Sequence, residues 1–397
     1  MKTNTILAAA VLIAFSLFLN EPLCQLLKKA QFPTFEYHLI DKIGGGLGQT
    51  SLADVDNDGD LDWICGQKKG DGGEIWWWEY KSPDNWIRHL MGYGDTDVGG
   101  SAYDINGDGW IDMFSGKKIL LNPGSPRKKQ FAEYTVGTTY SHDSVFGDID
   151  GDGNLDAIAN WDNAGLFWYE IPKDPTKQWI SHTIETADTY KIHGGVSPHA
   201  IGDIDGDGDN DVVTGQAWYK NQDGTGLVWK QHKNIEFGEY KMFGLAVKTW
   251  LIDMNGDGAL DIVQTEADSP DGRVAWLEND GHGNWTRHLI KDKGDQQDFH
   301  SLIVADFDGD GDMDVFSGGG PLSGAPHKCY IWENTAGTGK NPTSRDWIEH
   351  IVAEKPCHEA VGGDVDGDGD IDICSKPWRT GNEHFYLKNM TMEMMSQ

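Results

Sequence analysis

The feature that most restricts the fold is a short acidic motif, D-x-[DN]-x-D-G-x-x-D, which recurs along the whole chain. The seven copies begin at Asp54, Asp104, Asp148, Asp203, Asp253, Asp306 and Asp364. A strand-like apolar run leads into each copy and another comes after it, as LIVADFD and MDVFSG do at the sixth copy. Self-similarity with a period of about 50 residues indicates one supersecondary unit repeated along the chain.

Two further strand-like runs recur in these units. The third run is aromatic, as in IWWWEY and VAWLEN, and the fourth has the form aromatic-x-x-His-x-apolar, as in WTRHLI. Four short strands per unit of about 50 residues are typical of a β-propeller blade. We therefore predict an all-β, seven-bladed β-propeller of four-stranded blades over residues 33–390, with a C-terminal tail at 391–397. A linear β-solenoid is the alternative.

The two ends of the chain predict how the ring closes. The seventh unit lacks a fourth strand, and the missing pattern appears as FEYHLI at 35–40, ahead of the first unit. An N-terminal strand that completes the last blade would cover two sheet edges that otherwise invite aggregation. A solenoid would leave this displaced strand unexplained.

Residues 1–24 are predicted to be a signal peptide. Lys2 precedes an apolar run from Ile6 to Leu19, and this run is shorter than the roughly 20 residues that span a bilayer. We expect a secreted, periplasmic or cell-surface protein with no membrane contact after signal removal. Cys24 is a poor match to a lipid-attachment site, and the spacing of the other cysteines assigns no disulfide pair.

Composition excludes some partners. The chain has 64 acidic and 32 basic residues and a net charge of −32, which argues against nucleic acid or an anionic membrane as partner. Its 17 Trp, 12 Tyr and 14 Phe indicate a packed core, because disordered acidic chains are poor in aromatic residues. The oligomeric state is not indicated.

The acidic motifs predict calcium loops. Positions 1, 3, 5 and 9 are always Asp or Asn and position 6 is always Gly. Hard oxygen ligands around a sharp glycine turn suit Ca²⁺ in up to seven loops, in a structural role. The alternative is an Asx-rich turn without metal. The predicted ligands are Asp54, Asp56, Asp58 and Asp62; Asp104, Asn106, Asp108 and Asp112; Asp148, Asp150, Asp152 and Asp156; Asp203, Asp205, Asp207 and Asp211; Asp253, Asn255, Asp257 and Asp261; Asp306, Asp308, Asp310 and Asp314; and Asp364, Asp366, Asp368 and Asp372.

The histidines fall into two classes. Six belong to the fourth-strand pattern and are predicted to be structural: His38, His89, His182, His232, His288 and His350. Four others stand four or six residues before the first aspartate of a loop, namely His142, His199, His300 and His358. They occur in only some blades, so the repeat does not require them. We expect them on innermost strands, at a solvent-filled mouth opposite the calcium loops, where they could hold Zn²⁺ or another divalent ion. The alternative is that they only line a watery channel.

The far end of each second strand should return to the same mouth. The residues there are Gln67, Lys117, Trp161, Gln216, Glu266 and Lys376. Polar groups that converge on one opening are typical of a sugar or metal pocket. Trp161 and Trp378 could stack against a sugar face, although either could equally be rim packing.

The acidic repeats resemble FG-GAP/VCBS repeats, the units of integrin-type propellers, across residues 35–390. More narrowly, GQTSLADVDNDGDLDW, HSLIVADFDGDGDMDVFSGGG and CHEAVGGDVDGDGDIDICSKPW are similar to the propeller domain of the aldos-2-ulose dehydratase family. That resemblance implies a metal-dependent lyase that acts on keto-sugars, with a metal at the base of the propeller cleft. It covers the propeller and not the cupin and lectin domains of those enzymes.

These observations favour an exported carbohydrate-active lyase or dehydratase. A divalent ion at the inner histidines would polarise a keto-sugar or uronic-acid-containing saccharide for β-elimination. The base stays open among a free histidine of the cluster, Lys248, Lys376 and Glu266. The alternative is a non-catalytic, calcium-stabilised propeller that binds a glycan or a protein; integrin-type adhesion has the weakest support. The sequence contains no nucleophile elbow, P-loop or dinucleotide fingerprint.

Overall fold

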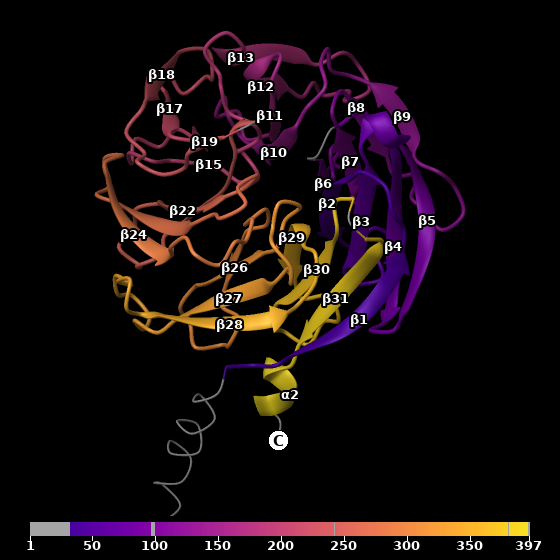
Figure 1. Ribbon diagram of the computed structural model, residues 1–397. Coiled ribbons are helices and arrows are strands. Elements are labelled where there is room, and N and C mark those ends of the chain that lie inside the picture. Colours follow the sequence, from indigo (N-terminus) through magenta and orange to yellow (C-terminus); the bar gives the residue numbers. More distant parts are fainter. Residues whose placement is uncertain (1–31, 97–99, 242, 380, 396–397) are drawn as a thin grey trace, which may run out of the picture.

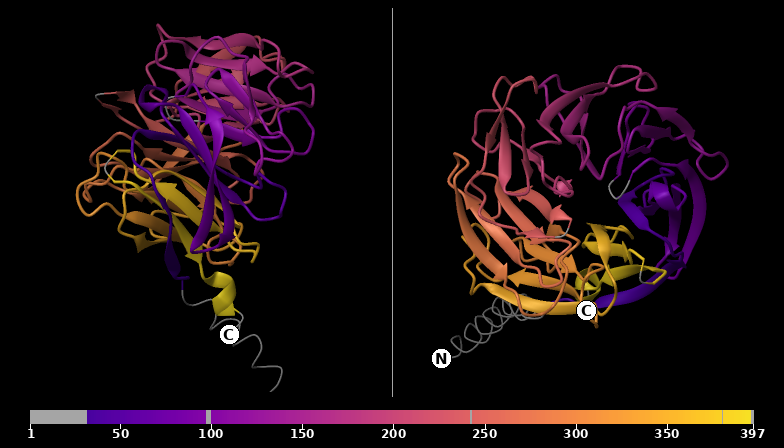
Figure 2. Two further views of the ribbon diagram at one scale, coloured as in Figure 1. Left: turned by 90° about the vertical axis from the view of Figure 1, so that its right-hand side faces the viewer. Right: turned by 45° about the horizontal axis from the view of Figure 1, so that its top comes forward.

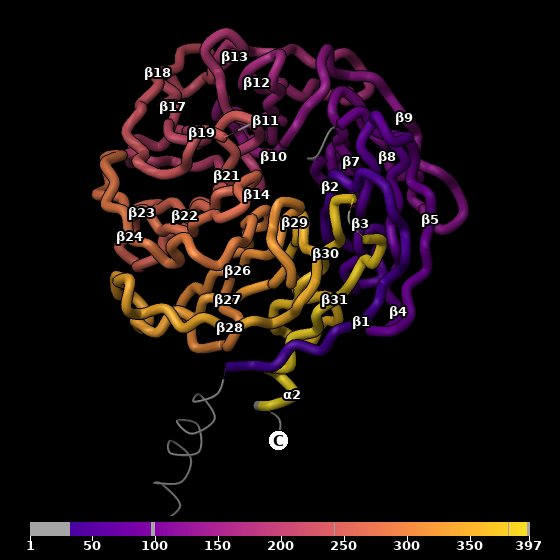
Figure 3. Tube along the Cα trace, in the orientation of Figure 1, coloured from indigo at the N-terminus to yellow at the C-terminus, as the bar shows by residue number. Residues whose placement is uncertain are grey.

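The protein is described here from a computed structural model, which covers residues 32–96, 100–241, 243–379 and 381–395. The predicted signal peptide lies outside these residues. Seven twisted β-sheets stand around a common axis as the blades of an all-β propeller (Figures 1 and 2). The Cα trace runs around the ring in sequence order, so that the strands at residues 35–42 and 383–389 lie side by side (Figure 3).

The first three blades have the predicted four-strand pattern, from the inside of the ring to its outside. Blade 1 consists of β2 (Leu47–Ala53), β3 (Asp62–Gln67), β4 (Glu74–Ser82) and β5 (Asn85–Tyr93). Blade 2 consists of β6 (Ser101–Tyr103), β7 (Asp112–Ser115), β8 (Lys118–Leu121) and β9 (Ala132–Thr135). Blade 3 consists of β10 (Asp143–Gly147), β11 (Asp156–Trp161), β12 (Gly165–Glu170) and β13 (Ile180–Thr186). A 3₁₀ turn, η1 (Lys69–Asp71), comes after β3.

Blades 4 to 6 repeat the pattern with one irregularity. Blade 4 consists of β15 (Ile201–Gly202), β16 (Asp211–Thr214), β17 (Ala217–Asn221) and β18 (Trp229–His232). Blade 5 consists of β21 (Val247–Ile252), β22 (Asp261–Glu266), β23 (Val274–Asn279) and β24 (Trp285–Lys291). Blade 6 consists of β25 (Ile303–Ala305), β26 (Asp314–Gly318), β27 (Cys329–Asn334) and β28 (Trp347–Ala353). The short β14 (Pro198–His199) leaves blade 4 and pairs in parallel with β21, giving blade 5 a fifth strand. A separate hairpin, β19 (Tyr240–Lys241) and β20 (Gly244–Leu245), precedes blade 5.

Blade 7 joins the two ends of the chain. Its strands are β29 (His358–Gly363), β30 (Asp372–Lys376), β31 (Glu383–Asn389) and the N-terminal β1 (Phe35–Lys42). The outermost strand β1 pairs antiparallel with β31, from Phe35 opposite Asn389 to Lys42 opposite Glu383. A short helix, α2 (Thr391–Met395), comes after β31. Among the described residues, the helices are too short to cross a membrane.

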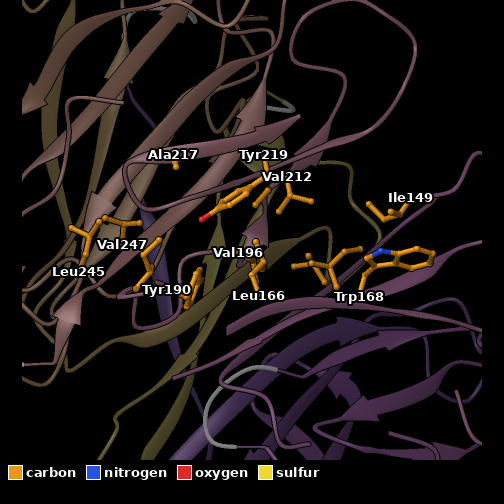
Figure 4. Packing of buried hydrophobic residues seen from close by; sticks show 14 residues of the cluster. Ile149, Leu166, Trp168, Tyr190, Val196, Val212, Ala217, Tyr219, Leu245 and Val247 are labelled. Atoms are coloured by element: carbon orange, nitrogen blue, oxygen red, sulfur yellow. The ribbon is translucent and has the colours of Figure 1, made fainter. Parts of the chain in front are cut away.

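The apolar core lies between neighbouring sheets. In Figure 4, Leu166 and Trp168 of blade 3 face Val212 and Tyr219 of blade 4, and each of these side chains is almost completely buried. Period-2 alternation sends every second residue of a strand toward one neighbouring blade and the next toward the other. This explains why the second and third strands are apolar on both faces, whereas the outermost strands alternate.

The ninth residue of each acidic loop is a buried aspartate that joins three parts of its blade. In blade 5, Asp261 Oδ2 accepts a hydrogen bond from Met254 N at 3.1 Å, and Oδ1 accepts one from Asn279 N at 2.8 Å. The carboxylate thus ties the start of the loop to the third strand. The first of these two bonds recurs in every blade, at Asp62, Asp112, Asp156, Asp211, Asp261, Asp314 and Asp372.

An asparagine that ends the third strand connects one blade to the blade before it. Asn279 Nδ2 in blade 5 donates to the carbonyl of Ile204 in the loop of blade 4 at 2.9 Å. The same bond crosses from blade 7 to blade 6, where Asn389 Nδ2 donates to Phe307 O at 2.8 Å. Neighbouring blades are therefore joined by hydrogen bonds as well as by the apolar core.

The fourth-strand histidines pack on the third strand, as expected for structural residues. The ring of His288 stacks on Trp276 with centroids 4.4 Å apart, and its Nε2 lies 2.9 Å from Glu278 Oε2. Corresponding stacks join His89, His182 and His232 to Trp77, Trp168 and Trp218.

Deleting residues 33–41 should destroy the native monomer, because this removes the outermost strand of blade 7 and leaves the edge of β31 unpaired. We expect aggregation, or a melting temperature far below that of the full chain, measured by size-exclusion chromatography and thermal denaturation. Tyr37→Ser is the matched control, since Tyr37 is 39% exposed and the backbone pairing of β1 is kept. A deletion variant that stays monomeric with native stability would contradict this role of β1.

Candidate functional site

Three of the predicted inner histidines lie at the end of the strands farthest from the acidic loops. His358, for example, pairs with Lys376 at one end of the β29–β30 hairpin, whereas the acidic loop closes the other end. His142, His300 and His358 are 3%, 5% and 3% exposed. The expectation that they stand at a solvent-filled mouth is therefore wrong, because they are buried among charged partners.

His300 and His358 form the centre of this arrangement. Their rings stack with centroids 4.2 Å apart. His300 has a carboxylate at each nitrogen: Nδ1 lies 3.2 Å from Glu359 Oε1, and Nε2 lies 3.8 Å from Asp268 Oδ2. Nδ1 of His358 lies 2.7 Å from Nζ of Lys376. One imidazole therefore faces two anions and the other faces an amine.

These surroundings shift the two histidine pKa values in opposite directions. Burial disfavours the charged form of His300, but the adjacent carboxylates of Asp268 and Glu359 outweigh it and raise its pKa to about 10. Burial, together with the nearby Lys376, holds the pKa of His358 well below its ordinary value. At neutral pH His300 is an imidazolium cation and His358 is a neutral imidazole.

Two buried lysines adjoin the stacked pair. Lys376 donates from Nζ to the carbonyl of Leu47 at 2.6 Å, and burial lowers its pKa to about 8. Lys248 Nζ lies 2.6 Å from Glu359 Oε1 and 3.8 Å from Asp143 Oδ2. Although burial opposes its charge, these two carboxylates raise the pKa of Lys248. Of the two predicted lysine bases, Lys376 alone is placed to release a proton near neutral pH.

A second pair of histidines extends the group. His142 Nδ1 lies 2.9 Å from Asp143 Oδ1, and its ring centroid is 4.1 Å from that of His193. His193 Nδ1 lies 2.9 Å from Asp162 Oδ2, and its Nε2 lies 4.0 Å from Asp268 Oδ2. Asp268 thus connects this pair with the stacked pair. We call His142, His193, His300 and His358, with the carboxylates that contact them, the histidine cluster.

Sequence reasoning missed His193, Asp268 and Glu359. The first two lie in connections between strands, and Glu359 occupies an irregular register in β29. Asp268 and Glu359 have φ values of 48° and 55°, a left-handed conformation that is uncommon for non-glycine residues and concentrates at functional sites. The one signal available in the sequence was that His193 and Asp268 stand at positions that the repeat does not require.

Three predicted site residues lie elsewhere. His199, on β14, lies with its Nδ1 3.1 Å from Leu251 O and lines a cavity of 720 Å³ along the ring axis, which Lys248 and Glu359 of the site also line. Glu266 forms a bidentate ion pair with Arg273, with contacts of 2.7 and 2.9 Å, so it is not free to act as the base. Gln216 lines a different cavity, between blade 4 and the β19–β20 hairpin.

The remaining predicted substrate contacts divide between two places. The ring of Trp378 lies 4.9 Å from the ring of His358, so Trp378 borders the histidine cluster. Lys117 Nζ lies 4.6 Å from the ring of Tyr140, and Trp161 packs 6.3 Å from the same ring. Gln67 is half-buried at the end of β3.

The residue types that could bind a divalent ion are present, but their donor atoms do not point toward one common position. One nitrogen of His300, one of His358 and an oxygen of Glu359 lie within 4.8 Å of one another. The two rings stack, however, so their lone pairs run side by side instead of converging on one point. Both nitrogens of His300 also face carboxylates. A divalent ion at these histidines stays a prediction, and we assign no chemical step to it.

The acidic loops have the turn geometry that the sequence predicts. The glycine at position 6 is left-handed in all seven loops, with φ between 87° and 101°, a conformation that favours glycine. In the sixth loop, Gly311 N donates to Asp306 Oδ2 at 2.9 Å. Groups of three carboxylates whose oxygens lie within 4.8 Å of one another start at Asp54, Asp148, Asp203 and Asp306, among others.

Three of the loops contain a cation supplied by the chain itself, and in blade 1 it is Arg127, 2.6 Å from Asp58. Lys220 Nζ in blade 4 lies 2.6 Å from Asp207 and also contacts the aspartate at position 3 of the same loop. Lys388 in blade 7 makes the same two contacts and lies 2.8 Å from Asp368. In blade 5 the residue before the third-strand asparagine is Glu278, which adds negative charge instead. The seven loops are therefore electrostatically unequal.

Comparison with known proteins supports the fold. Residues 253–317, from the acidic loop of blade 5 to β26, match the FG-GAP-like repeat family. An Agrocybe aegerita lectin that recognises non-reducing terminal N-acetylglucosamine is similar with a TM-score of 0.52 and 18% identity, over 82% of this chain and 91% of the lectin chain. BBS1N, from its complex with ARL6DN, is similar with a TM-score of 0.54 and 8% identity, over 90% and 96% of the two chains.

These matches define a seven-bladed propeller with an FG-GAP-like repeat, and identities this low show the fold alone. A search of curated proteins gave no match. The resemblance to aldos-2-ulose dehydratases stays a prediction.

The charge on His300 should make stability depend on pH. Its folded pKa of about 10 exceeds the ordinary 6.5, so its stabilising contribution is complete below pH 6.5 and is lost as the pH rises toward 10. The melting temperature of His300→Gln should therefore fall furthest below that of the native chain near pH 6, and the difference should shrink toward pH 10. Both proteins are measured in chelator; a constant difference would refute the ion-pair assignment.

Proposed function

We propose that this propeller is a carbohydrate-active lyase or dehydratase whose reaction centre is the stacked pair His300 and His358. The observation that carries the proposal concerns the stacked rings of His300 and His358. The charged and buried groups around them hold the two imidazoles in opposite protonation states. A pair of titratable groups whose environments push their pKa values apart is the arrangement that acid–base catalysis requires.

β-Elimination needs a base for the proton beside a carbonyl or carboxylate and an acid for the leaving oxygen. Once Lys376 has released its proton, the Nδ1–H of His358 donates to Nζ, and the Nε2 lone pair can accept the substrate proton. The electrons of that C–H bond form the new double bond as the β-oxygen leaves. His300 stabilises the developing negative charge and protonates the leaving oxygen from Nε2, which lies 3.8 Å from Asp268, too far for a hydrogen bond. Glu359, 3.2 Å from Nδ1, holds the ring in place.

The surroundings of the pair suit a saccharide. Trp378 borders the neutral histidine, and an aromatic face beside polar groups can stack on a sugar ring. The side chains of His193, Asp268 and Glu359 are 19%, 13% and 13% exposed and that of Asp162 is 44% exposed, so these residues form the accessible edge of the cluster. A keto-sugar or a uronic-acid-containing saccharide carries the acidic C–H that the chemistry needs.

A non-catalytic glycan-binding propeller is the second candidate. The fold is compatible with it, because a lectin that recognises non-reducing terminal N-acetylglucosamine has a similar structure, but that likeness supports no more than the fold. The histidine cluster favours the lyase, since saccharide binding alone gives no reason to bury a charged and a neutral imidazole in contact.

His300→Gln and His358→Gln should each lower the rate of elimination by about 10²- to 10⁴-fold, the usual contribution of a positioned acid or base. The assay is new ultraviolet absorbance from an unsaturated product with keto-sugars or uronic-acid glycans. His288→Gln is the control: it should keep full activity and lose stability on the order of 1 kcal/mol. Full turnover in both inner variants would rule out this reaction centre.

We also propose that the acidic loops bind calcium in the blades that supply no cation of their own. Secretion or surface exposure, proposed from residues 1–24, would provide calcium at the roughly 10⁻⁴–10⁻³ M that extracellular modules bind. Lys220 and Lys388 already neutralise the loops of blades 4 and 7, and Arg127 contacts Asp56 and Asp58 in blade 1. The proposal therefore assigns calcium chiefly to blades 2, 3, 5 and 6, fewer than the seven sites that the sequence suggests.

Chelation should lower the melting temperature markedly, because the carboxylates of each loop repel one another without metal. Lys388→Gln should raise the bound calcium by about one ion per chain by freeing the seventh loop, as measured by elemental analysis. The exposed Lys173→Gln is the matched control and should leave the calcium content unchanged. If the native chain bound seven calcium ions, or none, the assignment of calcium chiefly to blades 2, 3, 5 and 6 would be contradicted.

A further inference from the structure

A second cavity lies beside the histidine cluster. It has a volume of 510 Å³ and is lined by residues of blade 4, the β19–β20 hairpin and the start of β23. Its polar and charged lining includes Lys191, Gln216, Lys233, Glu236, Tyr240 and Arg273. Gln216, which the sequence predicts as a substrate contact, belongs here and not to the cluster.

The cavity and the cluster share one wall. Tyr190, Lys191 and Ile192 line the cavity, and the next residue, His193, belongs to the cluster. The segment is held against the hairpin, because His193 N donates to Leu245 O at 2.8 Å. The lining of the cavity therefore comes within one residue of the cluster along this segment.

The hairpin presents two aromatic side chains beside this shared wall. Phe243 stacks on the ring of His193 with centroids 5.8 Å apart and is 49% exposed. Tyr240 lines the cavity and is 59% exposed. Large aromatic side chains this exposed on a short hairpin contribute little to the core. Their ring faces are available to stack on successive sugar units.

The charges that remain available in the cavity are mainly positive. Arg273 is occupied by Glu266 and Glu239, and the latter also pairs with Lys241 and Lys293. Within the described parts of the chain, Lys191 and Lys233 form no ion pair, and Lys191 Nζ reaches only the carbonyl of Ala187 at 3.4 Å. Arg287 is a third lining cation without an ion pair among the described residues, and Glu185 and Glu236 are the lining carboxylates without one, so three such cations stand against two such acids.

We infer that this cavity is a distal subsite for acidic sugar units, and hence that the substrate is an oligosaccharide or polysaccharide containing uronic acid. The inference rests on the proposed function, because it extends the substrate away from the stacked histidines. One unit sits at the cluster, the next crosses Phe243, and further units stack on Tyr240 with their carboxylates near Lys191 and Lys233.

Binding of galacturonic acid and of its dimer, tetramer and hexamer, measured by isothermal titration calorimetry, tests this inference. We expect the hexamer to bind more tightly than the dimer. Tyr240→Ala should weaken the tetramer and hexamer about tenfold, in the range of interface aromatic residues, and leave the dimer unchanged. Tyr134→Ala is the control, because Tyr134 is 38% exposed on the outer strand of blade 2.

The charge component needs its own variant. Lys191→Gln combined with Lys233→Gln should remove the preference for the galacturonate hexamer over the neutral xylohexaose, with thermal denaturation confirming that the variant is folded. The inference is overturned if the hexamer binds no better than the dimer, if Tyr240→Ala behaves like the native chain, or if the native chain binds both hexamers equally.

Failure of the proposed reaction would give a different result. If no saccharide is turned over but the galacturonate hexamer binds and Tyr240→Ala weakens it, the subsite stands and the lyase assignment falls. His358→Gln should keep hexamer binding within about twofold while losing turnover, since it leaves the cavity intact. Loss of binding in Tyr240→Ala together with normal turnover of the dimer would support both proposals.

Discussion

The ring depends on one buried carboxylate per blade, the ninth residue of each acidic loop. Each receives backbone N–H groups from the loop, as Asp261 does from Met254, and in most blades also from the third strand. The asparagine at the end of that strand then bonds to the preceding blade. Burial raises the pKa of Asp62 to about 8 and that of Asp372 to about 7, and the neighbouring loop carboxylates contribute to both increases. The contacts that close the blades thus also create the demand for cations.

The histidine cluster is built where the repeat imposes nothing. It lies at the opposite end of the strands, and its members come from inner-strand ends and from connections between strands. The left-handed backbone at Asp268 and Glu359 costs on the order of 1–3 kcal/mol at each residue. Buried charges add to that cost unless they are paired. The rest of the ring supplies the stability that offsets these costs. The residues of the cluster can therefore be selected for where they place charge and need not contribute to packing.

Features that obey the period of the repeat could be predicted from the sequence, and features that depart from it could not. Seven copies of one motif determined the number of blades, the strand order and the two classes of histidine, and the i−6 position identified His300 and His358. His199 was grouped with them because its spacing suggested the same face, but β14 leaves blade 4 and pairs with β21. His193 and Asp268 lie in connections whose path no period determines. The burial of the cluster was also missed, since spacing gives the position of a side chain along a strand but not the segments that cover it.

A chain with a net charge of −32 can still recognise an acidic saccharide, because the two ends of the ring are separate electrostatic environments. Screening limits the reach of exposed charges to about 8 Å at physiological ionic strength, so the acidic loops act mainly on the cations held in them. At the other end the balance is local. Asp268 and Glu359 are neutralised by His300 and Lys248. In the neighbouring cavity Lys191, Lys233 and Arg287 form no ion pair with any described residue, and they outnumber the unpaired Glu185 and Glu236. A carboxylate that approaches this cavity therefore meets a small local excess of positive charge, and the overall charge of the protein does not decide the sign of its ligand.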